Sequence, residues 1–214
     1  PDVAVDCEDS NGLSRSGTLT HLTFSILPLH HTWVICVNIL GISAFDTVGA
    51  SGKSIRNALE DRSTPQLWFD ARADSDALFG QYGIRLGNVI DIQIMELCAT
   101  FNKKRTNFNS LKNSVKEDGP HFMPASNCTQ WVKEKVEGRK YFTKQGWGIL
   151  NYHPLPAIAQ KYTVGDTFVL FGLYQCYLPR ILLAGKMLHM NMQAFVHVES
   201  LERVWNSKLP AYKP

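Results

Sequence analysis

The chain has 214 residues, of which 44% are hydrophobic and 19% are charged, and its formal net charge is +3. This composition excludes an intrinsically disordered chain, and the length suits one domain with a sizeable core. The small positive charge permits a nucleic-acid partner without requiring one. Five cysteines, widely spaced and odd in number, predict reduced thiols in an intracellular protein of the cytoplasm or nucleus. No apolar run reaches the length that a membrane span needs, so we expect no membrane partner.

The chain begins with an apolar strand that runs directly into two carboxylates. Residues 3–5 are Val-Ala-Val, and Asp6 and Glu8 follow with one residue between them. Alternate side chains of a strand share a face, so these two carboxylates should point the same way. Two neighbouring anions at the end of a buried strand favour a divalent cation between them. The alternative is that both are solvated residues at the entrance to the turn over 9–12.

Strands dominate the first part of the chain and helices the last. Residues 18–27 and 31–40 are rich in β-formers and predict two more strands. We then expect a helix over 54–61, a strand over 66–71, a helix over 74–82, a strand over 89–92 and a helix over 93–101. Helical patterns continue over 128–141, 156–175 and 178–205. This order predicts an α/β domain in which helices flank a mixed sheet.

A second acidic cluster opens the helix predicted over 74–82. Acidic side chains in a first helical turn satisfy free N–H groups and the helix dipole, which is a sufficient explanation for Asp70 and Asp76. Asp74 lies four residues before Leu78 and therefore shares a helix face with it. A carboxylate one turn from a core residue can be directed back at the sheet. We therefore choose Asp74 over Asp76 as the functional residue.

A third pair of residues lies in the helix predicted over 156–175. Tyr162 and Asp166 are four residues apart and share one side of that helix. The phenol would hydrogen-bond a water held by a metal ion that Asp166 ligates. The alternative for Tyr162 is a plain packing role in the core, which Phe would also fill.

Together these motifs resemble the DEDD superfamily of 3′–5′ exonucleases. Asp6-x-Glu8, Asp74 and Tyr162-x-x-x-Asp166 occur in the order of its three motifs, and the tyrosine is typical of the ribonuclease D-like (DEDDy) branch. Residues 70–78 and the Pro-Leu-Pro of 154–156 look like the Egalitarian-type subgroup, although Phe69 stands where close relatives often have histidine. The resemblance covers about residues 3–178. We therefore expect one exonuclease-like domain over 1–214, with a helical C-terminal extension over 179–214.

The resemblance implies a ribonuclease H-like fold, whose five-stranded mixed sheet has the order 3-2-1-4-5. It implies that two divalent cations, Mg²⁺ or Mn²⁺, are held by four carboxylates and that a tyrosine orients the attacking water. These catalytic residues are Asp6, Glu8, Asp74, Asp166 and Tyr162. The implied activity is hydrolysis from the 3′ end of a single-stranded nucleic acid, with RNA favoured over DNA. The alternatives are a catalytically weak adaptor in an RNA-processing complex, with a protein partner, and an interaction scaffold that binds no nucleic acid.

Positive charge gathers in the helical half of the chain, at 103–105 and over 133–144. Near an active site these side chains would contact backbone phosphates without reading bases. Aromatic residues would stack on terminal bases. We therefore assign nucleic-acid binding to Arg72, Arg139, Lys140, Trp147 and Tyr152. The alternative for the basic residues is a solvated helix face, because Glu134 and Glu137 are interleaved with them.

Overall fold

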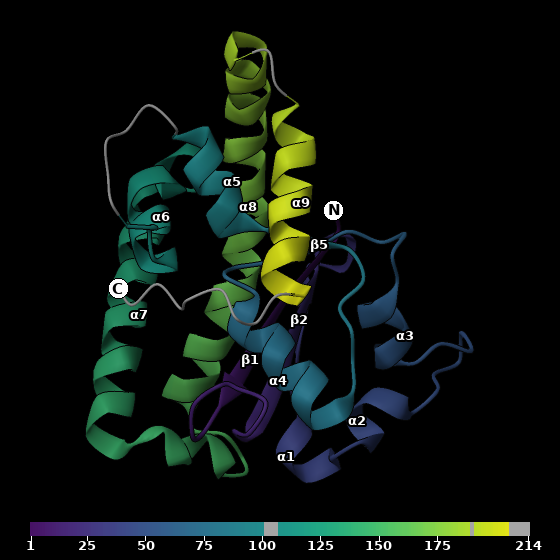
Figure 1. Ribbon diagram of the computed structural model, residues 1–214. Helices are drawn as coiled ribbons and strands as arrows, with labels where there is room; N and C mark the ends of the chain where they lie inside the picture. The colour runs from purple at the N-terminus through teal and green to yellow at the C-terminus, as the bar shows by residue number, and fades with distance from the viewer. Residues whose placement is uncertain (101–106, 189–190, 206–214) are drawn as a thin grey trace.

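A mixed β-sheet forms the centre of the molecule (Figure 1). The computed structural model describes residues 1–100, 107–188 and 191–205. In these ranges the strands are β1 (Val3–Asp9), β2 (Leu19–Ile26), β3 (His31–Cys36), β4 (Gln66–Trp68) and β5 (Val89–Asp91). Their order is β3-β2-β1-β4-β5; β1, β2 and β3 pair antiparallel, and β4 is parallel to both β1 and β5. The predicted sheet and its order are therefore confirmed.

Helices cover both faces of this sheet (Figure 1). Over the described ranges they are α1 (Val37–Leu40), α2 (Ser43–Asp46), α3 (Ile55–Glu60), α4 (Arg72–Tyr82), α5 (Ile92–Ala99), α6 (Leu111–Asp118), α7 (Ala125–Gln145), α8 (Ala157–Leu188) and α9 (Met192–Trp205). Short 3₁₀ turns η1, η2 and η3 lie at Leu27–Leu29, Gly119–His121 and Trp147–Asn151. The helices α1 to α4 pack on one face, and α5, α6 and α8 pack on the other.

The alternation of side chains along β1 decides which residues face α8. Val5 and Cys7 are buried in the cluster that includes residues of α1 to α4. Ala4 is buried in the other cluster, with residues of α5 and α8. Asp6 and Glu8 share the face of Ala4 because successive side chains of a strand point to opposite sides. The period of two in β1 therefore directs both carboxylates toward α8.

Two strands end well before their predicted boundaries. The strand expected over 31–40 ends at Cys36, where the buried Val37 turns the chain into α1. The strand expected over 66–71 ends at Trp68, because Asp70 adopts a φ of 58° that no strand accommodates. The N–H groups of Asp70 and Ala71 donate instead to the carboxylate of Asp91, at 3.1 and 3.3 Å. Tertiary contacts thus end the fourth strand.

The C-terminal helices differ from their predicted boundaries. The segments expected over 156–175 and 178–205 form instead one 32-residue helix, α8, and a separate helix, α9. Pro179 lies inside α8 without ending it. Helix α8 therefore runs through residues 178 and 179, and the division into a motif-bearing core and a C-terminal extension stays a prediction. Helix α9 returns along α8 and packs against β5 and α4 (Figure 1).

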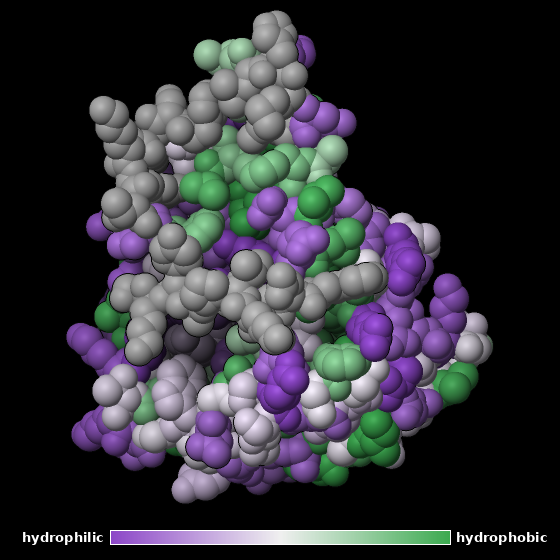
Figure 2. Space-filling model, viewed as in Figure 1, coloured by the Kyte–Doolittle hydropathy of each residue, from purple (hydrophilic) through white to green (hydrophobic). Residues whose placement is uncertain are grey.

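Helix α8 is long and apolar enough, over Ala157–Met187, to span a membrane by length and composition alone. This differs from the sequence expectation. The packing accounts for the composition, because Leu170, Leu173, Tyr177 and Ile181 are buried in the core cluster that α8 forms with the sheet. Figure 2 shows hydrophobic surface around the upper ends of α8 and α9. The large exposed apolar side chains of these two helices are Phe168, Leu182, Leu183, Met187, Phe195 and Val198.

Candidate metal and active site

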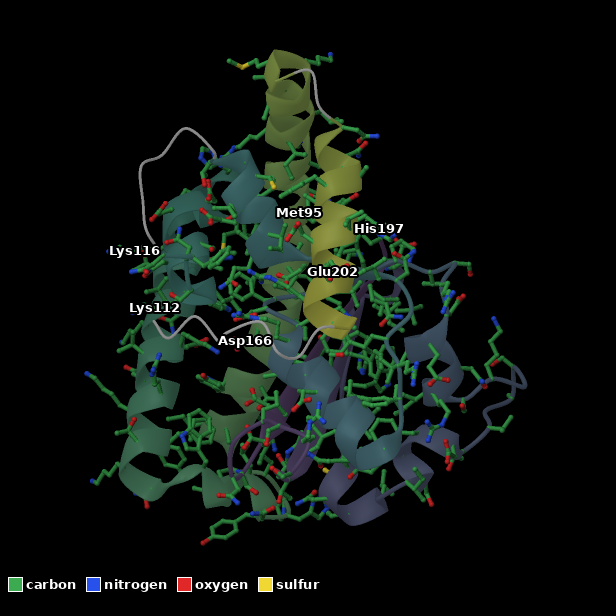
Figure 3. All side chains as sticks on the ribbon, viewed as in Figure 1. Met95, Lys112, Lys116, Asp166, His197 and Glu202 are labelled. Carbon is green, nitrogen blue, oxygen red and sulfur yellow. The ribbon has the colours of Figure 1, made fainter. Side chains whose placement is uncertain are left out.

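Carboxylates from β1 and α8 converge on the face of the sheet that α8 covers. Oxygen atoms of Asp6, Glu8 and Asp166 lie within 4.8 Å of one another. Figure 3 labels Asp166, where α8 passes the strands. Asp166 is more than 150 positions away from Asp6 and Glu8 in the sequence, and the packing of α8 on β1 brings it to them. Three clustered carboxylate oxygens are suitable ligands for a divalent cation of the Mg²⁺ or Mn²⁺ type.

Asp74 lies beside this cluster without belonging to it. Its buried carboxylate accepts a hydrogen bond from the N–H of Cys7 at 3.1 Å, which places it against β1 between Asp6 and Glu8. Asp76 was the other candidate for the functional aspartate of this helix. Its carboxylate pairs with Arg15 at 2.6 Å instead. The spacing argument from Leu78 therefore selected the aspartate that the structure brings to β1.

The connection that leads to Asp74 is fixed by α9. The carboxylate of Asp91 accepts hydrogen bonds from the N–H groups of Asp70 and Ala71, and it also pairs with Arg203 of α9 at 2.9 Å. Arg203 lies 3.5 Å from Asp70 as well. A residue near the end of the described chain therefore holds the β4–α4 connection in place.

The electrostatics of the cluster favour a cation. Burial, and then the charge of Asp166, raise the pKa of Asp6 to about 7. Burial, and then the charge of Asp6, raise the pKa of Glu8 and of Asp74 well above their ordinary values. One carboxylate oxygen of Asp166, Oδ1, is buried and has no hydrogen-bond partner among the described residues. A divalent cation would supply the missing partner and offset the repulsion, so these residues fit one.

Lys135 is a member of the site that sequence analysis missed. Its ammonium pairs with Asp166 and lies 3.5 Å from the centre of the Tyr162 ring. The sequence suggested a solvated face for the basic residues of this helix. A signal was nevertheless present: Cys128, Trp131, Lys135, Gly138 and Phe142 are spaced by three, four, three and four residues. This is the spacing of an inward-facing helical stripe, and Lys135 occupies its middle.

Tyr162 packs against the same stripe of α7. Its ring makes an edge contact with Phe142, with the centroids 5.1 Å apart. Gly138 provides the room, because a Cβ there would lie 2.5 Å from a ring carbon of Tyr162. Burial raises the pKa of the Tyr162 phenol above its ordinary value, so the hydroxyl is protonated at neutral pH. The structure therefore places the tyrosine beside Asp166 and Lys135.

A basic groove adjoins the site. It has a volume of about 590 Å³. Among the described residues its lining includes no acidic side chain and five basic ones, Lys112, Lys135, Arg139, Lys140 and Lys144, with Tyr162 at one side. Figure 3 labels Lys112 near α7. Arg139 and Lys140 therefore line a groove that also contains Lys135 and Tyr162, the neighbours of Asp166.

The other residues assigned to nucleic-acid binding lie outside the groove lining. Arg72 is held by Asp70, with its Nη2 2.7 Å from Oδ2. Trp147 stacks on Phe142 at 4.5 Å and remains partly exposed, and Tyr152 is exposed. The basic residues 103–105 lie outside the described residues.

The raised pKa of Asp6 predicts a pH dependence of stability. Between pH 3.8 and about 7 the folded protein binds more protons at Asp6 than the unfolded chain does. Rising pH therefore removes stability through this group. We expect the melting temperature of Asp6→Asn, relative to wild type, to rise as the pH rises from 5 to 8 in EDTA.

Comparing the two proteins at each pH cancels other titrating groups, such as the buried His21, whose lowered pKa acts in the opposite direction. Differential scanning fluorimetry provides the measurement. If the melting temperature of Asp6→Asn relative to wild type stays constant or falls across this pH range, the raised pKa of Asp6 is wrong.

Comparison with known proteins places this geometry in a family. A family model for 3′–5′ exonuclease domains matches residues 1–181. Ribonuclease D from Trypanosoma brucei, solved as a GMP complex, is similar in structure with a TM-score of 0.72 and 18% identity over 99% of this chain. This chain spans 60% of the length of that one.

Two further structures have the same fold. Ribonuclease D from Trypanosoma brucei in complex with RNA U12 has a TM-score of 0.62 at 16% identity, covering 94% of this chain and 71% of its own. Brucella melitensis NrnC with bound Mg²⁺ has a TM-score of 0.65 at 15% identity, covering 99% and 89%. Curated protein sequences give no significant match. From the family match and the fold, we conclude that this chain belongs to the 3′–5′ exonuclease family.

Proposed function

We propose that this protein hydrolyses phosphodiester bonds from the 3′ end of a single-stranded nucleic acid, RNA in preference to DNA. The observation that carries the proposal is the convergence of Asp6, Glu8 and Asp166 within 4.8 Å. The family supports the reaction, and the structural neighbours solved with GMP, RNA U12 and Mg²⁺ support the choice of ligands.

Four carboxylates would hold two divalent cations, Mg²⁺ or Mn²⁺. Asp6, Glu8 and Asp166 form the cluster itself, and Asp74 approaches it through its contact with Cys7. When bound, such ions lower the pKa of a water molecule and stabilise the charge on the scissile phosphate. The protonated phenol of Tyr162 would hydrogen-bond the attacking water and fix its direction. Because burial raises the pKa of Tyr162, it acts as a positioning group and not as the base.

The basic groove would hold the phosphates of the strand behind its 3′ end. Its side chains, among them Arg139 and Lys140, contact phosphate charge and carry no base-reading geometry. The exposed Tyr152 and the partly exposed Trp147 would stack on bases of the strand. We therefore expect binding that tolerates different sequences and weakens with salt.

A labelled oligonucleotide tests this proposal. A 5′-labelled single-stranded RNA incubated with Mn²⁺ should shorten from its 3′ end, and EDTA should stop the reaction. Asp74→Asn should slow it strongly, whereas Asp76→Asn, two residues away on the same helix but paired with Arg15, should not. Binding of the RNA without shortening in either Mn²⁺ or Mg²⁺ would favour the adaptor function instead.

The close packing of Tyr162 against α7 predicts that Gly138 does not tolerate a larger side chain. Gly138→Ala places a methyl group 2.5 Å from a Tyr162 ring carbon, so the ring must move. We expect the rate of hydrolysis to fall by about a hundredfold, as displacements of about 1 Å at catalytic groups do. Gly148→Ala is the matched control, because no atom lies within 4 Å of its added Cβ. Equal initial rates for the two variants would argue against a positioning role for Tyr162.

A further inference from the structure

Lys135 lies at a position where the site calls for a cation. Its side chain is only 15% exposed and that of its partner Asp166 only 12%. The ammonium pairs with Oδ2 of Asp166, and Glu8 acts on it as a further nearby negative charge. The ring face of Tyr162 lies 3.5 Å away, a geometry that favours a positive charge. Three neighbours from two elements thus surround this one ammonium group.

Its burial distinguishes Lys135 from the other lysines of α7. Lys133 lies two residues earlier on the same helix, where its side chain is 66% exposed. The Lys133 ammonium approaches Glu137 only to 4.0 Å. A long basic side chain is rarely held inside a protein unless it is paired. Lys135 therefore belongs to the carboxylate cluster and not to the solvated surface.

We propose that Lys135 is the cation held by the carboxylate cluster when metal is absent, and that a divalent ion must displace its ammonium from Asp166 to use that carboxylate. The proposal rests on the metal-dependent function proposed above. Its physical basis is competition, because an ammonium and a divalent ion a few ångströms apart repel each other strongly in a poorly solvated site. The two cations cannot share Asp166 at low cost.

The structure also shows where the displaced ammonium would go. Lys135 lines the basic groove as well as contacting Asp166, and Tyr162 borders both places. The flexible four-carbon stem of lysine allows its ammonium to turn from the carboxylate into this groove. A phosphate of a bound strand would provide a new partner there. Lys135 thus acts as a positioning residue with two alternative anionic partners.

Mn²⁺ binding in the absence of nucleic acid tests the proposal. In isothermal titration calorimetry at pH 8, Lys135→Met should bind Mn²⁺ about tenfold more tightly than wild type, which corresponds to about 1.4 kcal/mol. Without metal, the same variant should melt several degrees lower, because the carboxylates lose their counter-charge. Lys133→Met is the matched control and should resemble wild type in both measurements. Lys135→Arg keeps the charge and should keep the weaker Mn²⁺ affinity.

The results separate this proposal from the function on which it rests. Unchanged or weaker Mn²⁺ binding by a folded Lys135→Met protein overturns the role of Lys135. An equal gain in affinity for Lys133→Met also overturns it, because the effect would then be one of overall charge. If Asp6→Asn binds Mn²⁺ as wild type does, the metal site itself is wrong. If Asp6→Asn loses binding while Lys135→Met is unchanged, only the competition is wrong.

Discussion

Asp6→Asn should lower the rate of single-stranded RNA hydrolysis by about a thousandfold, a loss of about 4 kcal/mol in transition-state stabilisation. Asp6 lies in the three-carboxylate cluster and points to the same side of β1 as Glu8. The amide keeps the shape of the side chain but removes a negative charge from the site that we propose holds divalent ions. Single-turnover rates at saturating Mn²⁺ provide the measurement.

The stability of this variant makes the prediction specific. In the metal-free protein Asp6 and Asp166 repel each other, so the neutral amide should leave the melting temperature unchanged or raise it. A folded, thermally stable protein that has lost its activity is the expected result. Asp76→Asn should stay within about twofold of the wild-type rate, because its partner Arg15 lies outside the cluster. An Asp6→Asn protein with a tenth or more of the wild-type rate would contradict the catalytic assignment.

Arg203→Met should lower the free energy of unfolding by about 3–5 kcal/mol, the usual cost of removing one partner of a buried ion pair. Asp91 is fully buried, and Arg203 neutralises its carboxylate from 2.9 Å. The guanidinium also hydrogen-bonds Gln93 at 2.9 Å. Methionine fills similar space but leaves the carboxylate charge of Asp91 without its cationic partner. Urea denaturation followed by circular dichroism gives the difference in free energy.

A neighbouring residue on α9 provides the control. Glu202 is exposed, and Figure 3 labels it on that helix. Glu202→Gln changes the net charge by one without disturbing a buried pair, so its effect should stay within about 0.5 kcal/mol. If Arg203→Met loses less than 1 kcal/mol, the pair with Asp91 is not what holds α9 against the sheet.

The sequence predicted those parts of the site that depend on local periodicity. The period of two in a strand placed Asp6 and Glu8 on one face, and the period of a helix related Tyr162 to Asp166 and Asp74 to Leu78. These relations survive in the structure because they depend on residues at most four positions apart. The order of the strands came from the family resemblance, since short-range patterns do not determine which strands pair.

Features that depend on distant contacts were missed. Asp70 ends the fourth strand early because Asp91 and Arg203, far along the chain, hold that connection. Lys135 resembled a surface lysine because its partner Asp166 is 31 residues away on another helix. The sequence alone does not show which partner a charged side chain contacts, because that partner can lie far away along the chain.

Tyr162 and Asp166 lie near the N-terminal end of the single long helix α8. The C-terminal part of the same helix is held by other contacts. At that end, Tyr177 and Arg180 hold Asp118 of α6, with contacts of 3.1 and 2.7 Å. Sliding or twisting of the helix would move the phenol and the carboxylate in concert relative to β1, while their mutual spacing stays constant. Weakening the contacts with Asp118 would therefore let α8 shift and so change the position of Asp166 relative to Asp6.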